Sequence, residues 1–346
     1  MVKYVIKRIL LALFTCFIVL SIAYLLLCCL PITRRLDPNI GTRFAYYMDY
    51  VDNGFLVYTH EPVTYYGDLL EHIYQTATGT DYYFYQAPVF MRYWTWISGI
   101  LTRWDWGTAL FVEDGLPAMN VLLSRLPTTV SVNVISVFFS VPLGIGLGVL
   151  CALKKDSIFD NIVQVLIMVI IAIPSFVLIS YCILLAYSTD WLPPYFQGNS
   201  IDTGRRIASY IIPVFILSIG SLCGYARFVR AELCEVLESD YLLLARTKGL
   251  TRRQAITRHA FRNAMVPVLP SVVSEFVAIL GGSMILENLY QIEGVGRLYM
   301  DAFTAKDYSV LMADMSFYTV IGLLASIIVD LSYGFIDPRI RMGAKK

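Results

Sequence analysis

Long apolar runs alternate with polar stretches along the sequence. The runs cover residues 9–30, 130–153, 162–187, 207–226, 264–286 and 315–336, and each holds at most one charged residue. A helix needs roughly 20 apolar residues to cross the hydrocarbon core of a bilayer, and every run reaches that length. The pattern therefore predicts six transmembrane helices.

Composition supports this prediction and excludes a soluble domain. The chain is 57% hydrophobic and 15% charged, with a mean hydropathy of +0.63, whereas a soluble domain has roughly 25% charged residues. The net charge of +1 favours no acidic partner such as a nucleic acid. The seven cysteines lie within or just after apolar runs, which is not the pattern of a disulfide framework or a metal site.

The distribution of basic residues predicts the orientation of the helices. Lys and Arg concentrate in the first eight residues, at Lys154 and Lys155, in residues 227–262 and at the C-terminus. Because cytoplasmic loops retain basic residues, both termini are expected in the cytoplasm. The first apolar run is too long for a signal peptide and lacks a small-x-small cleavage site, so we expect it to remain as the first helix. The loop that follows it is rich in acids, namely Asp49, Asp52, Glu61, Asp68, Glu71 and Asp81.

Residues 239–270 form a basic island between two apolar runs. Ser239 or Asp240 can cap a short helix over residues 241–248, and Gly249 can end it in a left-handed turn. Thr251 and Gln254 have the spacing of a capping box, which predicts a second helix that continues to about residue 267. The first helix sets an apolar group among cations, which is typical of a docking surface. That group comprises Leu242, Leu243, Leu244 and Ala245, beside Arg246 and Lys248.

The island, DYLLLARTKGL followed by RHAFRNAMVPVLP, resembles the cytoplasmic loop of ABC importer permeases of the oligopeptide/dipeptide family. The resemblance implies that the first helix is a coupling helix seated in a cleft of an ATPase subunit. The residues involved would be Asp240, Tyr241, Leu243, Leu244, Ala245, Arg246, Thr247, Lys248, Gly249 and Leu250. The sequence departs from the family at the nominal Glu-Ala-Ala positions, which are Leu243, Leu244 and Ala245. An amphipathic basic helix on anionic lipid is the alternative interpretation.

Further segments resemble the same family in the same order. They are an Asp-x-Gly turn at Asp105 and Gly107, RLPTT at residues 125–129, IEGVGRL at 292–298 and DPRIR at 337–341. The resemblance covers the first helix and about residues 90–346. It does not cover the tyrosine-rich residues 37–86. Their tyrosines can form a recognition surface, or they can pack a small outer cap or lie at the level of the lipid headgroups. We favour the second interpretation.

Glu275 is an acidic residue in the middle of the fifth apolar run. An ionised carboxylate there costs at least about 2.5 kcal/mol when it faces lipid, so we expect it to face a pathway or a partner. Ile279 and Gly282 follow at spacings of four and seven, which places them on the same helical face. The three residues are our candidates for the translocation path. A neutral glutamate with a packing role is an equally weighted alternative.

The sequence contains no nucleotide-binding loop and no catalytic constellation. It has no Gly-x-x-x-x-Gly-Lys-Ser/Thr, and its three histidines are not paired with a nucleophile in a plausible site. We therefore expect no enzyme activity, metal or cofactor on this chain. ATP and Mg²⁺ would be bound by partner subunits.

The predicted fold is an all-α membrane protein of six helices, similar to a type I ABC importer permease, with a large extracytoplasmic insertion between the first two helices. Its segments are residues 1–30, 31–129 and 130–346, with a coupling loop at 230–263. The resemblance implies a bacterial or archaeal cytoplasmic membrane, a second permease, two ATPases and an extracytoplasmic binding protein that delivers peptides. Import of oligosaccharides or nickel, an ATP-independent channel or carrier, and a membrane scaffold are the alternatives.

Overall fold

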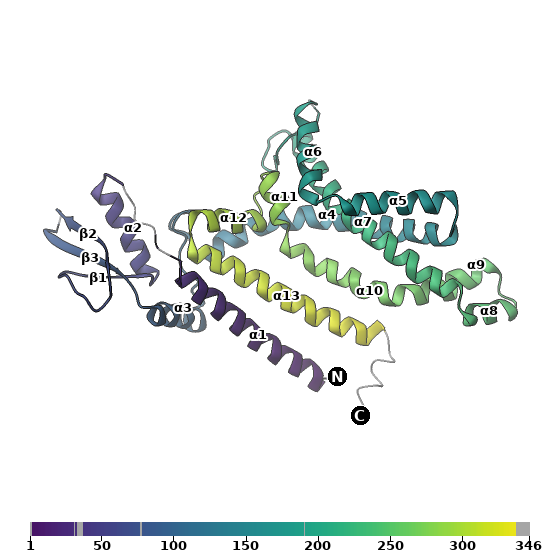
Figure 1. Cartoon of the computed structure of the whole chain (residues 1–346), viewed down its shortest axis with the longest axis horizontal. Coiled ribbons are helices and arrows are strands. Elements are labelled where there is room, and N and C mark those ends of the chain that lie inside the picture. The colour runs from purple at the N-terminus through teal and green to yellow at the C-terminus, as the bar shows by residue number, and fades with distance from the viewer. Residues whose placement is uncertain (1, 31, 33–36, 77, 190, 337–346) are drawn as a thin grey trace. The chain divides into compact units, whose positions relative to one another are not determined.

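The fold is taken from a computed structural model that describes residues 2–30, 32, 37–76, 78–189 and 191–336 (Figure 1). The motif at 337–341 and the basic residues after it lie outside the described residues. The described part contains five helices that are long and apolar enough to span a membrane, or six if a bent helix pair counts as one span. The chain is thus a mostly helical multi-pass membrane protein, as predicted.

The membrane-spanning helices agree with five of the six apolar runs in position. They are α1 (Val2–Cys28), α4 (Ala118–Leu153), α7 (Thr203–Leu237), α10 (Phe261–Ala278) with the turns on either side of it, and α13 (Tyr308–Ile336). Several of them extend beyond the apolar run that predicted them, since their polar ends continue as helix outside the hydrocarbon core.

The third run, residues 162–187, is not one continuous helix. It forms α5 (Ile158–Ala172) and α6 (Ser175–Tyr187), whose axes differ by 93°. The break lies at Ile173, which is extended, and Pro174. A proline disfavours helical backbone in the residue before it and has no N–H to donate, so the helix ends there. The prediction of a single helix is corrected at this point.

The chain divides into two compact units. The first comprises Met1–Ile9, Leu126–Arg297 and Ile321–Lys346, and the second comprises Leu10–Arg125 and Leu298–Val320. Several long helices contribute residues to both units, so the units differ from the three consecutive segments defined on the sequence.

In the first unit, α4 packs closely on α7. A Cβ at Gly144 would lie 2.8 Å from the backbone oxygen of Leu222, and one at Gly148 would lie 2.7 Å from that of Ala226. Only glycine allows the two backbones this approach. The contact fixes the position of α7, whose last residue precedes the basic island.

The second unit contains a small cap built from the tyrosine-rich residues. Helix α2 (Ile40–Asp52) accompanies an antiparallel sheet of β1 (Leu56–Thr59), β2 (Leu69–Gln75) and β3 (Thr80–Gln86), in the order β1-β3-β2. This sheet is a departure from the all-α prediction. The sequence of β3, TDYYFYQ, is rich in aromatic residues that favour strands.

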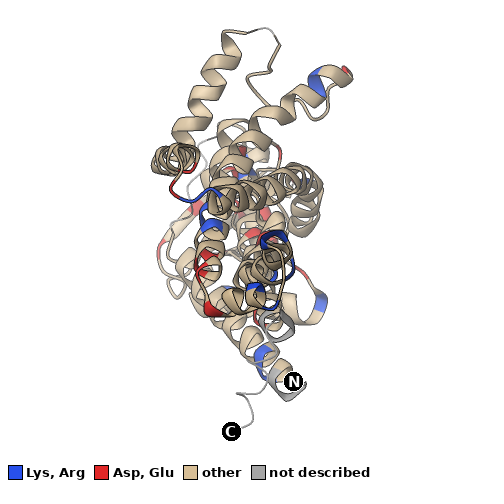
Figure 2. Cartoon of the chain, turned by 90° about the vertical axis from the view of Figure 1, so that its right-hand side faces the viewer, with Lys and Arg blue, Asp and Glu red and all other residues tan. Residues whose placement is uncertain are grey.

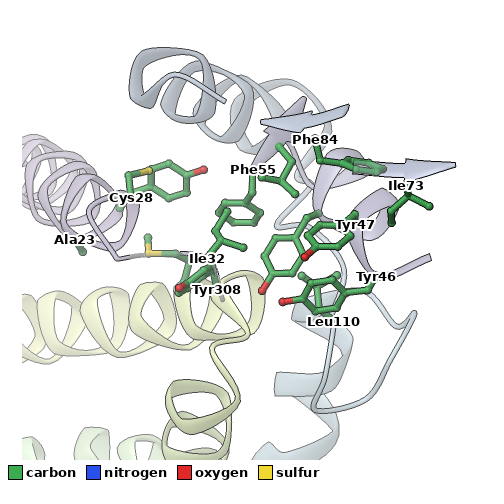
Figure 3. Packing of buried hydrophobic residues seen from close by; sticks show 14 residues of the cluster. Ala23, Cys28, Ile32, Tyr46, Tyr47, Phe55, Ile73, Phe84, Leu110 and Tyr308 are labelled. Carbon is green, nitrogen blue, oxygen red and sulfur yellow. The ribbon is translucent and has the colours of Figure 1, made fainter. Parts of the chain in front are cut away.

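The cap has a core of aromatic side chains (Figure 3). Tyr47 is completely buried and stacks on Phe84 with ring centroids 5.1 Å apart, and Tyr46 and Tyr50 are buried beside them. Tyr65 has 71% of its surface exposed. The three tyrosines of α2 therefore pack the cap, whereas Tyr65, between β1 and β2, lies on its surface.

Asp307 ties the segment with the Asp-x-Gly turn to the start of α13. Its carboxylate is fully buried and accepts the backbone N–H groups of Leu110, Phe111 and Val112 at 2.7, 2.9 and 3.3 Å. One side chain thus satisfies three donors in a loop that has no strand or helix partners for them.

Glu287 plays a similar part in the first unit. It lies on α11 (Met284–Leu289), is 3% exposed, and accepts the Thr129 hydroxyl at 3.0 Å and the Arg297 N–H at 3.1 Å. A side chain at Gly294 would collide with this carboxylate and with Thr129. The glycines of the IEGVGRL turn are therefore required by packing around Glu287.

Candidate functional site

The first helix of the basic island is α8 (Asp240–Thr247), which begins and ends one residue before the predicted bounds. Ser239 occupies the N-cap position, but its hydroxyl donates to the backbone oxygen of Val236 and makes no capping bond. The prediction of Ser239 as a side-chain cap is therefore wrong, and Asp240 lies in the first turn.

Gly249 makes the turn after α8, as predicted. Its φ is +92°, a conformation that side-chain-bearing residues rarely adopt, and its N–H donates to Arg246 O at 3.0 Å. A Cβ at this position would have no neighbour within 4 Å. The requirement for glycine here comes from the backbone conformation alone.

The capping box that starts the second helix is confirmed. Thr251 Oγ1 accepts the Gln254 N–H at 3.3 Å, and Gln254 Oε1 accepts the Thr251 N–H at 3.0 Å. The helix is α9 (Arg252–Ala255), which continues through a π-helical turn, η1 (Ile256–Ala260), into α10. It does not end near Pro267 but runs to Ala278. Single π-helical turns frequently lie at functional sites.

Helix α8 divides its leucines between the protein and the surface. Leu242 is 5% exposed and packs in a cluster with Ala152, Leu233, Ala255, Ala260 and Ala264. Leu243 and Leu244 are 61% and 55% exposed. Arg246, Thr247 and Lys248 are also exposed, whereas Ala245 and Leu250 are half-buried. The helix is thus anchored on one side and presents Leu243 and Leu244 beside Arg246 and Lys248 on the other. Figure 2 shows the ribbon with the Lys and Arg positions in blue, seen from the side on which α8 and α9 lie in Figure 1.

A groove of about 350 Å³ runs beside α8. Its lining includes Glu238 and Asp240 as well as Arg246 and Arg252, so both signs of charge border it. Leu243 lies at its edge. A partner that docks here can bury the leucines and pair with charges of either sign.

Two ion pairs hold the turn between α4 and α5 against the end of α7, directly before α8. Asp160, which is fully buried, accepts two bonds from the Arg230 guanidinium at 2.7 and 2.6 Å. Lys155 pairs with Glu238, and this hydrogen bond lowers the pKa of the Glu238 carboxyl and raises the pKa of Lys155. Neither pair could be predicted from the sequence, because the partners are 70 and 83 residues apart.

The three candidate path residues do not share one helical face. Helix α10 ends at Ala278, Ile279 begins a 3₁₀ turn, and Gly282 has a φ of +61°. Ile279 is 7% exposed and packs in the core between α4, α7 and α10. Glu275 is half-buried, and its carboxylate interacts with the hydroxyl of Tyr225. The prediction of a common face is therefore wrong, and the path role of these residues stays a prediction.

Asp314 is a buried acidic residue that the sequence analysis did not single out. It is fully buried on α13, within the candidate span Tyr308–Ser332. Asp314 lies directly before the sixth apolar run, which begins at residue 315. The apolar residues that precede Asp314 are the sequence signal that could have placed it inside the span. Among the described residues, no group of three His, Cys, Asp or Glu is placed to hold a metal ion.

Comparison with known proteins assigns a family. Residues 144–342 match the model of the binding-protein-dependent transport system inner membrane component. The chain belongs to this permease family.

The relatives of this permease include one that matches it over nearly the full length of both chains. The chain is 28% identical over 343 residues to the dipeptide transport system permease protein DppB of Lactococcus lactis subsp. cremoris (strain MG1363), covering 99% of the chain and 100% of that protein. It is 30% identical to DppB of Bacillus subtilis (strain 168), over 76% of the chain and 83% of that protein. The oligopeptide transport system permease protein AppB of the same strain is 28% identical over 73% of the chain and 81% of that protein.

The family match contains α8, Gly249 and Glu275 of the permease but none of its cap. The L. lactis alignment extends over nearly the whole chain, so it also spans residues 37–86.

Proposed function

We propose that this chain is a membrane-spanning subunit of an ATP-driven importer of peptides. Its family and the peptide-transport names of its relatives support this reading. The observation that carries the proposal is α8, which exposes Leu243 and Leu244 next to the Gly249 turn. Two exposed leucines beside Arg246 and Lys248, on a helix anchored through the buried Leu242, are suited to insertion into a cleft of a partner protein.

The proposed partners follow from two features of the chain, namely the lack of a nucleotide-binding loop in its sequence and the exposed leucines of α8. Because the sequence has no loop for nucleotide phosphates, ATP and Mg²⁺ are bound by two ATPase subunits, one of which receives α8. A second, related permease completes the path, and an extracytoplasmic binding protein delivers the peptide. Both termini and α8 lie on the cytoplasmic side, which the basic residues of the island and of the α4–α5 turn support.

We propose that Glu275 faces the substrate path, with Ile279 and Gly282 as further candidates. Glu275 is half-buried, whereas Ile279 packs in the core of its own unit. A carboxylate that faces a water-filled path between two permeases can bind the cationic amino terminus of a peptide.

Co-purification followed by an ATPase assay tests the proposal. The tagged chain, expressed with the other subunits of its transporter, should purify with the two ATPases and the second permease. ATP hydrolysis should then increase on addition of binding protein and peptide together. Purification as a homo-oligomer that transports alone would establish a channel or carrier instead. A complex whose ATPase ignores binding protein and peptide would indicate a scaffold.

A further inference from the structure

Helix α3 (Val89–Arg103) exposes an apolar stripe on the side opposite to the one it buries. Phe90, Trp94 and Leu101 are 77%, 62% and 75% exposed, and their spacing places them on one face. Trp104, the C-cap residue, is 68% exposed and prolongs the stripe. The opposite face holds the buried Arg92 and Gly99 and the half-buried Trp96.

The buried face of α3 is attached to the last two turns of α1. Tyr24 donates to the backbone oxygen of Arg92 at 3.2 Å, and Arg92 Nη2 donates to the backbone oxygen of Cys28 at 2.8 Å. The rings of Tyr24 and Trp96 stack with their centroids 4.4 Å apart. At a rise of about 1.5 Å per residue, these contacts lie within about 6 Å of the end of α1. Helix α3 is therefore held at the level where the first span leaves the hydrocarbon core.

Helix α1 also exposes apolar side chains at this level. Ile22, Leu25 and Leu26 in the same two turns of α1 are 53%, 41% and 65% exposed. A membrane-spanning helix exposes such residues to acyl chains, so lipid reaches the place where α3 is attached. Tryptophan is enriched at this depth, because its ring is apolar and its N–H stays near the headgroups.

The charges of α3 also favour contact with lipid. The helix contains no acidic residue, and its last residue, Arg103, has 71% of its side chain exposed, with the Asp105 carboxylate 4.0 Å from its guanidinium. A basic group at the end of an apolar stripe can reach the phosphates of lipid headgroups.

We propose that α3 is an interfacial helix that lies in the plane of the membrane, with Phe90, Trp94, Leu101 and Trp104 inserted at the boundary between headgroups and acyl chains. The partner of this surface is lipid. The insertion would hold the cap of α2 and the sheet at the membrane surface, since α3 follows β3 directly.

Nitroxide accessibility tests the proposal in the complete transporter in nanodiscs of phosphatidylcholine and phosphatidylglycerol. Cysteines at positions 94, 101 and 102, in a background free of native cysteines, carry the label. At 94 and 101 we expect collisions with oxygen to exceed those with a polar nickel reagent severalfold. Thr102 is exposed but lies about 100° around the helix from Leu101, so its label should meet the nickel reagent more readily.

The other outcomes contradict the proposal. Free access of the nickel reagent to 94 and 101 would mean that the stripe faces water. Exclusion of both reagents would mean that a protein covers it. Equal ratios of oxygen to nickel collisions at positions 101 and 102 would mean that the helix does not have one face in lipid and another in water.

A second measurement does not require removal of the native cysteines. This matters because some of them are buried, so that their removal can disturb the fold. The tryptophan fluorescence of the transporter is recorded in nanodiscs that contain phosphatidylcholine brominated near the headgroup end of its chains. Trp94→Phe should lower the quenched share of the fluorescence. Trp106→Phe removes a tryptophan that is 8% exposed and should not lower it. An unchanged quenched share in Trp94→Phe would overturn the proposal.

Discussion

Gly249 is the residue whose backbone geometry bears most directly on the proposed coupling to ATP hydrolysis. Its φ of +92° costs a side-chain-bearing residue about 1–2 kcal/mol, and no neighbouring atom would interfere with a Cβ. A substitution here therefore changes the turn after α8 without disturbing the packing elsewhere.

We expect Gly249→Val to lower peptide-stimulated ATP hydrolysis by about 5- to 30-fold, the range that corresponds to this strain. Gly249→Asn is the matched control, because asparagine tolerates the left-handed conformation and should retain most of the stimulation. Hydrolysis is measured on purified complexes of equal subunit content. Wild-type stimulation in the valine variant would remove Gly249 from the coupling mechanism.

Glu275 gives the second prediction at this scale. Glu275→Gln keeps the shape of the side chain and removes its charge. If the carboxylate binds a peptide amino terminus, the loss of a charged hydrogen bond worth about 1.5–3 kcal/mol should reduce uptake of such peptides by about tenfold or more. Uptake of N-acetylated peptides should change little.

Tyr225→Phe is the control for Glu275. It removes the hydroxyl that interacts with Glu275 and leaves the charge. Equal uptake losses for free and acetylated peptides in Glu275→Gln would show that Glu275 has only a packing role.

The sequence predicted the turns and helix caps whose hydrogen-bonding partners lie close together along the chain. The Gly249 turn and the Thr251–Gln254 capping box both involve neighbours within a few residues, and both are present. The bonds of Asp307 to residues 110–112 and of Asp160 to Arg230 join distant segments. No spacing rule on one sequence identifies such partners.

At the scale of elements, Asp160 in the first turn of α5 ties this helix to α7, near the residues that precede α8. Asp160 is fully buried and bound by both Nε and Nη2 of Arg230, whereas the pair of Lys155 and Glu238 is exposed. The buried pair should therefore hold the element, and the exposed pair should contribute little.

We expect Asp160→Asn to destabilise the permease by about 3 kcal/mol, because the Arg230 charge loses its buried partner. The melting temperature of the detergent-solubilised complex should fall by several degrees, and ATP hydrolysis should respond less to peptide. Glu238→Gln, at the exposed pair, is the matched control and should leave both nearly unchanged. Identical melting curves for Asp160→Asn and the wild type would contradict a positioning role for this pair.

The hydropathy pattern predicted most helices but not their interruptions. Helix α10 continues beyond residue 267 despite Pro267 and Pro270, whereas the run at 162–187 breaks before Pro174. The same residue type permits either result, because neighbouring helices decide whether the lost backbone bond is tolerated. The sheet of the cap was not predicted, because residues 37–86 lie outside both the apolar runs and the family resemblance, although the aromatic sequence of β3 favours a strand.

At the scale of the whole molecule, one chain carries an anchored docking helix, a set of membrane spans and a cap, and it has no nucleotide site of its own in its sequence. This combination fits one subunit of a larger machine. The family and the membrane-spanning character could be predicted from the sequence because they are spread over many residues. The two compact units could not, since they combine segments from both ends of the chain.

Peptide uptake into proteoliposomes tests the central claim most directly. The purified complex is reconstituted with ATP on the side of the ATPase subunits and with binding protein and labelled peptide on the other side. We predict uptake that requires ATP hydrolysis and binding protein together, and no uptake by this chain and the second permease without the ATPases. Uptake by the permease chains alone would contradict the account.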